Sequence, residues 1–301
     1  MLRILANDGL EAAAIKTLRD AGHEVVTEFH DVEALKTALL DFDVIVIRSA
    51  TKLRKELIDV IKGSRLKLMI RAGVGIDNID VEYAEANGIA VRNTPNSSSA
   101  SVAELALGHM FALARFIHIS NVTMKKGEWN KKHYQGVELA GKTLGLLGFG
   151  RISKSLAEKA SALGMKVVYT DLFKMEGYDQ FEYLTLDELL ARADFISCHV
   201  PLAPGSKAVL GEAEIAKMKD GVYLVNTARG GIIDEEALVK ALDSNKVAGA
   251  ALDVFVEEPT KNEALLAHPK VSLTPHVGGS TNEAQERIGG EVVQTILEFF
   301  K

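Results

Sequence analysis

Residues 142–153 read KTLGLLGFGRIS, in which an apolar strand pattern leads through closely spaced glycines into a helical pattern. Gly148 permits a tight turn, and Gly150 lets the backbone approach a phosphate group closely. The helix predicted to begin near Arg151 would direct its free amides and the positive end of its dipole toward that anion. We therefore expect a dinucleotide to lie against this turn, at Gly148, Phe149, Gly150, Arg151 and Ile152.

Two further residues bear on this site. Ser153 replaces the third glycine of the G-x-G-x-x-G fingerprint, and its small side chain still allows close packing of the helix on the strand. Asp171 ends the next strand pattern, about 20 residues after Gly150, where an acidic side chain holds the ribose hydroxyls of NAD. Its charge would repel the 2′-phosphate of NADP, so the sequence predicts NAD. The alternative is an ordinary strand–helix turn followed by an aspartate that caps a helix.

Apolar strand patterns alternate with helical patterns along almost the whole chain. The first strand series lies at 4–5, 25–26, 44–47, 68–70 and 89–91, and the second at 143–147, 167–169, 195–197, 222–225, 248–252 and 271–274. Helical patterns lie at 11–20, 32–40, 54–61, 81–87, 151–163, 187–192, 234–244 and 282–300, and a longer helical stretch at about 99–126 separates the two series. Continuous apolar strands separated by helices indicate parallel sheets covered on both faces. The sequence predicts an α/β fold with two Rossmann-like domains.

Composition excludes several classes of protein. The chain has 301 residues, of which 47% are hydrophobic and 25% charged, enough for one large or two ordinary globular domains. A net charge of −6 argues against nucleic acid or an anionic membrane as the main partner. The longest apolar zone, 105–119, carries His109 and Arg115, so no membrane span is expected. A single cysteine, Cys198, favours the cytoplasm, and the histidine spacing predicts no metal site.

Three later polar stretches each follow an apolar strand pattern: NTARGG at 226–231, LDVFVEEP at 252–259 and LTPHVGGS at 273–280. Open α/β sheets bind their ligands at such carboxyl ends of strands. The stretches supply a guanidinium, a carboxylate and an imidazole, from Arg229, Glu258 and His276. A histidine can take up a hydroxyl proton near neutral pH, and a carboxylate on its other nitrogen would fix the tautomer. An arginine can bind a substrate carboxylate through two hydrogen bonds. Taken singly, Glu258 and His276 would more often be ordinary loop residues, and Arg229 could equally be a surface arginine.

Together with other ordered stretches, these residues resemble the D-isomer-specific 2-hydroxy acid dehydrogenase family along essentially the whole chain. The other stretches are IRSATK at 47–52, RAGVGIDNID at 71–80, NTPN at 93–96, KGEW at 126–129 and LAGKT at 139–143. So many matches in order are more specific than any single motif. The resemblance implies a cofactor domain at 96–281, inserted into a discontinuous substrate domain made of residues 1–95 and 282–301.

The resemblance also implies roles for single residues. Arg229 would bind the substrate carboxylate and carbonyl, and Glu258 would pair with His276, the proton donor and acceptor. The other implied substrate contacts are Arg48, the backbone of Gly73, Val74 and Gly75, and Asn96. The remaining implied cofactor contacts are His199, Val200, Pro201, Thr227, Ala228, Asp253, Gly278 and Gly279.

Within the family, the resemblance is closest to members that oxidise 3-phosphoglycerate to 3-phosphohydroxypyruvate in serine biosynthesis. It implies a homodimer formed through the cofactor domain, with residues 125–133 near the dimer interface. We hypothesise that Lys131 or Lys132 reaches the substrate phosphate of the neighbouring subunit. The alternative for these lysines is a solvated basic helix end. Because the sequence stops at residue 301, we expect the short form without a C-terminal regulatory domain.

Two other functions fit the same motifs. A glyoxylate or hydroxypyruvate reductase would share the chemistry and differ in its substrate pocket. A non-catalytic, NAD-sensing protein of the corepressor kind would keep much of the catalytic set without turnover. A panel of 2-oxo acids with NADH would separate the three possibilities.

Overall fold

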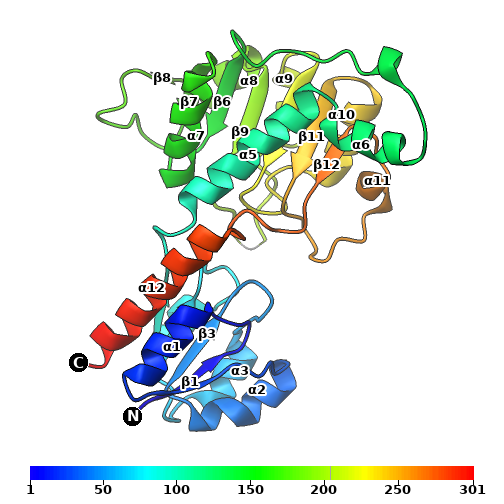
Figure 1. Cartoon of the computed structure of the whole chain (residues 1–301). Helices are drawn as coiled ribbons and strands as arrows, with labels where there is room; N and C mark the ends of the chain where they lie inside the picture. Colours follow the sequence, from blue (N-terminus) through cyan, green and yellow to red (C-terminus); the bar gives the residue numbers. More distant parts are fainter. Residues whose placement is uncertain (204) are drawn as a thin grey trace. The chain divides into compact units, whose positions relative to one another are not determined.

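The computed structural model describes residues 1–203 and 205–301 (Figure 1). These residues form two compact units, one made of residues 1–99 and 279–301 and the other of residues 100–278. Each unit is built on one parallel sheet. The predicted α/β fold with two parallel sheets is confirmed.

In the first unit the sheet has five strands, in the order β2-β1-β3-β4-β5. The strands are β1 (Arg3–Ala6), β2 (Glu24–Val26), β3 (Val44–Ile47), β4 (Leu68–Arg71) and β5 (Ala90–Asn93). Side chains alternate between the two faces of each strand, and β3 is buried on both faces, as its apolar run predicts. The order reverses between β1 and β3, so their carboxyl ends flank the topological switch point of this sheet.

Helices cover both faces of the first sheet. They are α1 (Ala12–Asp20), α2 (Val32–Ala38), the 3-10 turn η1 (Leu39–Asp41), α3 (Lys55–Ile61), α4 (Val81–Ala86) and α12 (Asn282–Phe299). Ile288, Val292 and Ile296 of α12 share a core with Leu18 of α1 and with one face of the sheet. Gly289 permits this contact, because a Cβ there would lie 2.9 Å from the Cβ of Ala14. The last helix of the chain therefore packs beside the first one (Figure 1).

The second unit contains a seven-stranded sheet in the order β12-β11-β10-β9-β6-β7-β8. Its strands are β6 (Thr143–Leu147), β7 (Lys166–Thr170), β8 (Glu182–Tyr183), β9 (Phe195–Cys198), β10 (Val222–Asn226), β11 (Val247–Leu252) and β12 (Val271–Leu273). Here the order reverses between β6 and β9. The glycine turn after β6 therefore lies at the switch point, where sheets of this kind bind ligands.

Two groups of helices enclose the second sheet. Buried residues of α5 (Ser99–Ala114) and α7 (Arg151–Ala162) share a core with one face. The other face packs against α8 (Leu186–Arg192), α9 (Glu212–Lys217), α10 (Glu235–Asp243) and α11 (Glu263–Leu266). Two short elements, α6 (Ile117–Lys125) and the 3-10 turn η2 (Lys131–His133), follow α5.

The structure corrects the predicted secondary structure in two respects. The helical stretch at 99–126 is not continuous, because Phe116 has a left-handed backbone (φ 56°) that separates α5 from α6. The sequence prediction also missed β8, α9 and α11, which have two, six and four residues. Elements this short offer too few turns or alternations for a hydrophobic period to be recognised.

Within the described ranges, no single helix is long and apolar enough to cross a membrane. The only candidate there is the pair α5 and α6, which passes by length and composition but bends by 64° at the break. Half of α5 is buried against the second sheet.

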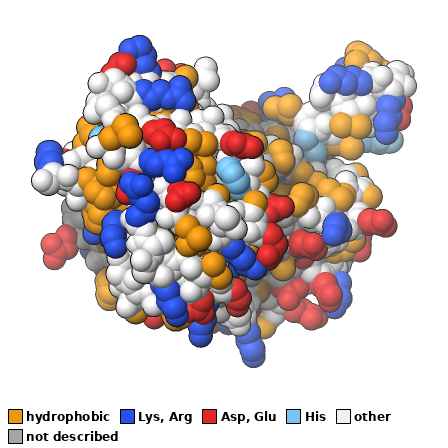
Figure 2. All heavy atoms as spheres, turned by 90° about the horizontal axis from the view of Figure 1, so that it is seen from below, with side chains coloured by type: hydrophobic (Ala, Val, Ile, Leu, Met, Phe, Trp, Pro, Cys, Tyr) orange, Lys and Arg blue, Asp and Glu red, His pale blue; other side chains and the backbone are white. Residues whose placement is uncertain are grey.

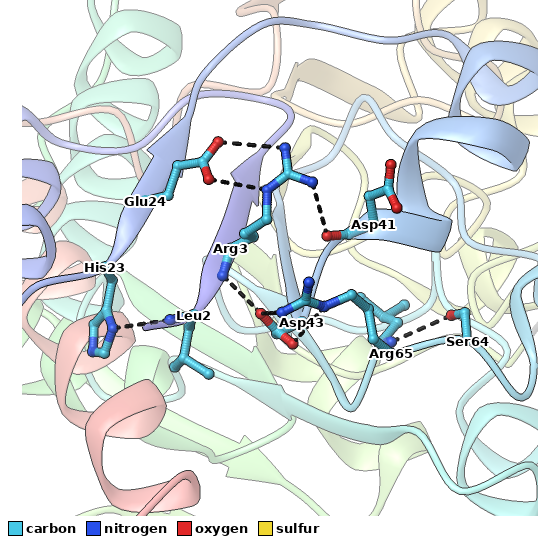
Figure 3. A network of polar contacts seen from close by, with 9 residues as sticks. Leu2, Arg3, His23, Glu24, Asp41, Asp43, Ser64 and Arg65 are labelled. Carbon is cyan, nitrogen blue, oxygen red and sulfur yellow. Dashed lines mark hydrogen bonds and ion pairs between the residues drawn. The ribbon is translucent and has the colours of Figure 1, made fainter.

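A network of charged side chains joins the amino ends of the first sheet's strands (Figure 3). Asp43, which precedes β3, accepts a hydrogen bond from the backbone N–H of Arg3 at 2.7 Å. It also accepts two from the Arg65 guanidinium, at 2.9 and 2.8 Å. Arg3 in turn forms an ion pair with Glu24 of β2 at 3.0 Å. The network therefore connects β1, β2, β3 and the segment before β4. Elsewhere on the surface, Figure 2 shows acidic and basic side chains interspersed over the face that it draws.

Candidate functional site

The glycine turn of the second unit connects the end of β6 to the start of α7. Gly148 has a left-handed backbone (φ +88°), and a Cβ there would lie 2.8 Å from the carbonyl oxygen of His199. The turn thus passes β9 more closely than any side chain would allow. Gly150 is the residue before α7, and a Cβ on it would meet nothing within 4 Å. The space in front of Gly150 and the helix amides is therefore open to an anion.

Side chains hold this turn in place from behind. The Ser153 hydroxyl donates a hydrogen bond of 2.6 Å to the Gly148 carbonyl, so the residue that replaces the third glycine fastens the turn. Phe149 is buried and stacks on Tyr169 of β7, with ring centroids 4.0 Å apart. These contacts support the turn in the absence of a ligand, and such preorganisation lowers the entropic cost of binding.

Asp171 lies beside the turn, as the position after β7 predicts. Its carboxylate accepts hydrogen bonds of 2.7 Å from the backbone N–H groups of Phe149 and Leu172. A carboxylate at this edge of the glycine turn fits the ribose hydroxyls of a dinucleotide. The open space at Gly150, the helix N-terminus and Asp171 together match the groups that NAD requires.

Two polar atoms near the switch point are buried and find no hydrogen-bond partner among the described residues. They are Thr227 Oγ1 and His199 Nδ1. The other ring nitrogen of His199 contacts the Ser197 hydroxyl at 2.8 Å, and burial lowers the pKa of His199 to about 4. Its neutral imidazole and the Thr227 hydroxyl could bind polar groups of a cofactor. Val200 and Pro201 continue the chain from His199.

Cys198, the last residue of β9, has a different character. It is fully buried, and burial raises the pKa of its thiol to about 12. A thiol in this state is neither a nucleophile nor a metal ligand at neutral pH. Across the described residues there is also no group of three or more His, Cys, Asp or Glu side chains that could hold a metal ion.

His276 and Glu258 lie on two different loops of the second unit, after β12 and β11. Their side chains meet in a hydrogen bond of 2.7 Å between His276 Nδ1 and Glu258 Oε2. They remain 29% and 35% exposed, respectively. Because the carboxylate occupies Nδ1, the Nε2 atom is the one left for another proton acceptor or donor.

Glu258 is held as an anion by its surroundings. Partial burial raises its pKa, but the hydrogen bond and electrostatic interaction with His276, together with the charge of Arg229, lower the pKa below its ordinary value. The Phe255 backbone N–H also donates to Glu258 Oε1 at 3.1 Å. This carboxylate stays ionised at neutral pH and can stabilise an imidazolium.

Arg229 lies near Glu258 and His276 because the loop after β10 crosses the loop after β11. A Cβ on Gly230 would lie only 1.8 Å from the Phe255 carbonyl oxygen, so only glycine lets the two loops cross here. The guanidinium of Arg229 donates to the Ala228 carbonyl at 2.5 Å, and the Ala228 N–H donates to the Asn226 side chain at 3.1 Å. The structure thus places Arg229, Glu258 and His276 in one region of the second unit.

Asp253 is 1% exposed and lies directly after β11. Its two carboxylate oxygens accept hydrogen bonds from the backbone N–H groups of Val277 and Gly278, at 2.8 and 2.9 Å. A Cβ on Gly278 would lie 3.1 Å from Asp253 Oδ2, which makes glycine the best fit there. These bonds fix the segment that carries His276.

The predicted substrate residues Arg48, Gly73, Val74, Gly75 and Asn96 belong to the first unit. Arg48 lies at the switch point between β1 and β3, and its backbone N–H donates to the Asp8 carboxylate at 2.7 Å. A Cβ on Gly73 would collide with the Arg71 guanidinium at 1.3 Å, and the carbonyl of Val74 accepts from Asn93 at 2.5 Å.

The unit boundaries differ slightly from the predicted domain boundaries at 95/96 and 281/282. Asn96 donates to Glu291 of α12 at 3.1 Å, and Arg287 donates to the Ser97 carbonyl at 2.8 Å. Gly279, predicted as a cofactor contact, also lies in the first unit, where a Cβ on it would be 3.5 Å from that of Ser98. These contacts with α12 and within the loop assign residues 96–99 and 279–281 to the first unit.

Lys131 and Lys132 are exposed on the 3-10 turn η2 of the second unit. Sequence reasoning missed two other residues, His109 and Thr274, which contact each other beside Asp253 at 3.0 Å. The sequence feature that could have identified His109 is an imidazole among the apolar residues of α5, whose buried residues include Val102, Ala106 and Leu113.

Comparison with known proteins places the chain in a family. Residues 107–278 match the family model described as the D-isomer specific 2-hydroxyacid dehydrogenase, NAD binding domain. The chain is 47% identical to a hydroxypyruvate reductase of Thermotoga maritima, over 98% of this chain and 97% of the relative. It is 45% identical to a D-3-phosphoglycerate dehydrogenase of Methanocaldococcus jannaschii, over the full chain but only 58% of that relative's length.

Among solved structures, the TT0316 protein from Thermus thermophilus superposes with a TM-score of 0.90. It is 33% identical in sequence, and the match covers 98% of this chain and 96% of that one. The resemblance predicted from the sequence is confirmed by these matches, as is NAD as the cofactor by the family model. The chain is a member of the D-isomer specific 2-hydroxyacid dehydrogenase family and carries its NAD-binding domain.

Proposed function

We propose that the protein interconverts a 2-oxo acid and a D-2-hydroxy acid, with NAD as the hydride carrier and His276 as the proton donor and acceptor. The observation that carries this proposal is the 2.7 Å contact between His276 Nδ1 and Glu258 Oε2. It lies in the same unit as the glycine turn that fits the dinucleotide. We assign cofactor binding to the second unit.

Bound NADH would supply the hydride for reduction of the 2-oxo carbon. His276 holds the proton that the new alkoxide oxygen requires, at Nε2, because Nδ1 faces Glu258. In the oxidation direction the same nitrogen takes the hydroxyl proton, and the ionised Glu258 stabilises the imidazolium that results. A general acid–base group of this kind accelerates a reaction by about 10²–10⁴-fold.

Arg229 would bind the substrate carboxylate and polarise its carbonyl. Its guanidinium already uses one Nη1 hydrogen bond to the Ala228 carbonyl, which orients the group. A planar guanidinium carries paired N–H donors whose geometry matches a carboxylate. In our proposal Arg48 and the backbone from Gly73 to Gly75, which belong to the first unit, are also substrate contacts.

For the substrate we propose 3-phosphohydroxypyruvate and 3-phosphoglycerate, with hydroxypyruvate as the second candidate. Relatives at 45% and 47% identity carry these two activities in their names, and the reductase matches this chain over nearly its whole length. The two oxo acids differ by one phosphate group, so a cationic phosphate site would decide between them. The exposed pair Lys131 and Lys132 can supply that charge.

The test is a panel of 2-oxo acids with NADH, followed by absorbance: 3-phosphohydroxypyruvate, hydroxypyruvate, glyoxylate and 2-oxoglutarate. His276→Ala should lower kcat by about 10²–10⁴-fold while NADH binding is retained. Absence of turnover with every acid, with NADH binding intact, would favour the NAD-sensing alternative.

The substrate assignment has its own test. Replacing both lysines, Lys131→Ala with Lys132→Ala, should raise KM for the phosphorylated acid and leave KM for hydroxypyruvate unchanged. Equal kinetics of the double variant and the wild-type protein on 3-phosphohydroxypyruvate would remove the phosphate site from the proposal.

We also propose a homodimer formed through the second unit. Several large apolar side chains are exposed on α6 and just after it: Ile117, Val122, Met124 and Trp129. Exposed apolar side chains that gather on one surface often mark a contact with another protein. Light scattering coupled to size exclusion would measure the mass, and Met124→Lys should dissociate the dimer if α6 forms the contact.

A further inference from the structure

His109 is a buried imidazole that the proposed chemistry does not use. It lies on α5 and is only 4% exposed. Its two ring nitrogens contact two hydroxyl groups at the end of the sheet, with Nδ1 3.2 Å from Ser272 Oγ and Nε2 3.0 Å from Thr274 Oγ1. An imidazole with both nitrogens engaged is fixed in orientation.

The direction of each hydrogen bond follows from Asp253. Thr274 Oγ1 lies 2.6 Å from Asp253 Oδ1, and a carboxylate only accepts, so the Thr274 hydroxyl proton points to Asp253. Thr274 Oγ1 must then accept from His109, which places the ring proton on Nε2. Nδ1 is left as an acceptor for the Ser272 hydroxyl. The chain of donors therefore runs in one direction, from Ser272 through His109 and Thr274 to Asp253.

Neutral His109 is the form that this chain requires, because an imidazolium could not accept from Ser272. Burial lowers the pKa of His109, while the nearby charge of Asp253 raises it and His118 lowers it. The net result is a pKa below the ordinary value. The imidazole is therefore neutral at neutral pH.

Asp253 transmits this arrangement to the loop that carries His276. Its oxygens hold the N–H groups of Val277 and Gly278, the two residues after His276. His276 itself has a left-handed backbone (φ 54°), which costs free energy in a residue other than glycine. That conformation persists only where neighbouring contacts enforce it, and here the Asp253 carboxylate is the anchor.

We propose that His109 is a positioning residue, which acts through Thr274 and Asp253 to hold the loop of His276 in its left-handed conformation. The inference rests on the proposed role of His276 for its catalytic consequence. Its structural part, the coupling of α5 to the amides of Val277 and Gly278, stands independently of any activity.

The experiment compares four variants by hydrogen exchange at the Val277 and Gly278 amides. His109→Leu fills the site without hydrogen bonds, and His109→Gln restores one N–H donor and one acceptor. Thr274→Val removes the middle hydroxyl, and Thr274→Ser retains it. Exchange should accelerate about five- to tenfold in His109→Leu and Thr274→Val, the worth of one hydrogen bond, and stay close to wild type in the other two.

His268→Leu is the matched control. It removes another imidazole of the second unit, whose Nδ1 accepts from the Lys270 N–H at 3.2 Å. It precedes β12 and reaches neither Thr274 nor Asp253 in any contact of the described chain. Exchange at Val277 and Gly278 should therefore be unchanged.

Steady-state kinetics provide the second readout. His109→Leu should lower kcat about five- to tenfold, the worth of one hydrogen bond. His109→Gln should recover most of kcat. If His109 had a purely structural role, the variants would have a lower Tm without this loss and recovery of kcat.

The outcomes separate the two proposals. If wild type turns over no 2-oxo acid, the proposed function fails, while amide exchange still tests the coupling. If His109→Leu and Thr274→Val both leave exchange and kcat as in wild type, the positioning role is wrong. It is equally wrong if the glutamine variant is as impaired as the leucine variant. Should His109→Leu fail to fold, Thr274→Val and Thr274→Ser alone carry the comparison.

Discussion

The amino ends of the two sheets are built alike. In the first unit Asp43 precedes β3 and accepts from the Arg3 N–H of β1 and from Arg65. In the second unit Asp194 precedes β9 and accepts from the Thr143 N–H of β6 at 2.8 Å and from Lys219 at 2.9 Å. In both units an aspartate fastens the two strands that flank the switch point.

The carboxyl ends of the same strands differ. In the first unit the Asp8 carboxylate accepts hydrogen bonds from the backbone N–H groups of Arg48 and Thr51, at 2.7 and 3.1 Å, beside the switch point. In the second unit, Gly148 presents only its backbone at this point. A Cβ on Gly150 would meet no atom of the described chain within 4 Å, so the space beside it is open. The comparison teaches that similar sheets acquire different roles through the residues at their carboxyl ends. Stability should depend on the amino ends, and ligand binding on the carboxyl ends.

We expect the largest effect, a loss of NADH affinity, from Gly148→Ala. A Cβ at φ +88° would collide with the His199 carbonyl, so the turn after β6 must rearrange. NADH affinity should fall by about 100-fold or more, because misplacing the turn removes the pyrophosphate contacts. Fluorescence titration with NADH measures this loss, and unchanged affinity would contradict the role of the turn.

The next effect should be on stability, from Asp43→Asn. In the variant, an amide NH₂ group replaces one carboxylate oxygen and faces N–H donors, so hydrogen bonds are lost. This loss should lower the free energy of unfolding of the first unit by about 2 kcal/mol. Asp194→Asn is the matched variant in the second unit and should cost less. Its carboxylate is 28% exposed, compared with 12% for Asp43. Lys219 donates one hydrogen bond to it, whereas the Arg65 guanidinium donates two to Asp43. Urea unfolding gives both values, while kcat should change less than twofold.

Gly150→Ala should separate binding from stability. A Cβ there meets no atom of the described chain within 4 Å, and the backbone is extended, so Tm should hardly change. The same Cβ would occupy the space expected for the pyrophosphate, so NADH affinity should fall about tenfold. A large loss of Tm, or full NADH affinity, would show that Gly150 serves the fold and not the ligand.

The smallest effect is the pH dependence of the Asp43 contribution. Burial raises the pKa of Asp43, but hydrogen bonds from Arg65 and from the Arg3 N–H hold it below the ordinary value of 3.8. A lowered folded-state pKa means that the stabilisation is complete above pH 4 or so and is lost as pH falls through the folded pKa. The difference in stability between wild type and Asp43→Asn should therefore stay constant from about pH 7 to 5 and shrink below about pH 4. Unfolding curves at several pH values test this.

The strands other than β8 were predictable because each is an apolar run. The pattern at 44–47, for instance, became β3 with the same bounds. The break at Phe116 could not be predicted, since neither glycine nor proline marks it. Two-residue β8 carries no period at all.

Some residues of the candidate site could likewise be predicted from the sequence, and others could not. Arg229, Glu258 and His276 were found because each follows a strand within a recognisable stretch, and the structure brings Glu258 and His276 into contact. His109 was missed because its partners, Ser272 and Thr274, lie more than 160 residues away along the chain. Only packing of α5 on the sheet reveals that relation.

The chain has one cysteine, and its reaction with a thiol reagent can report the opening of the second sheet. Cys198 ends β9, the strand between β6 and β10, and its thiol is fully buried and protonated. A thiol reagent can reach it only when this part of the sheet opens, so the labelling rate measures that opening in unmodified protein. Because the strand ends beside the glycine turn, NADH should slow the labelling, which gives a binding assay that requires neither a substrate nor an engineered probe.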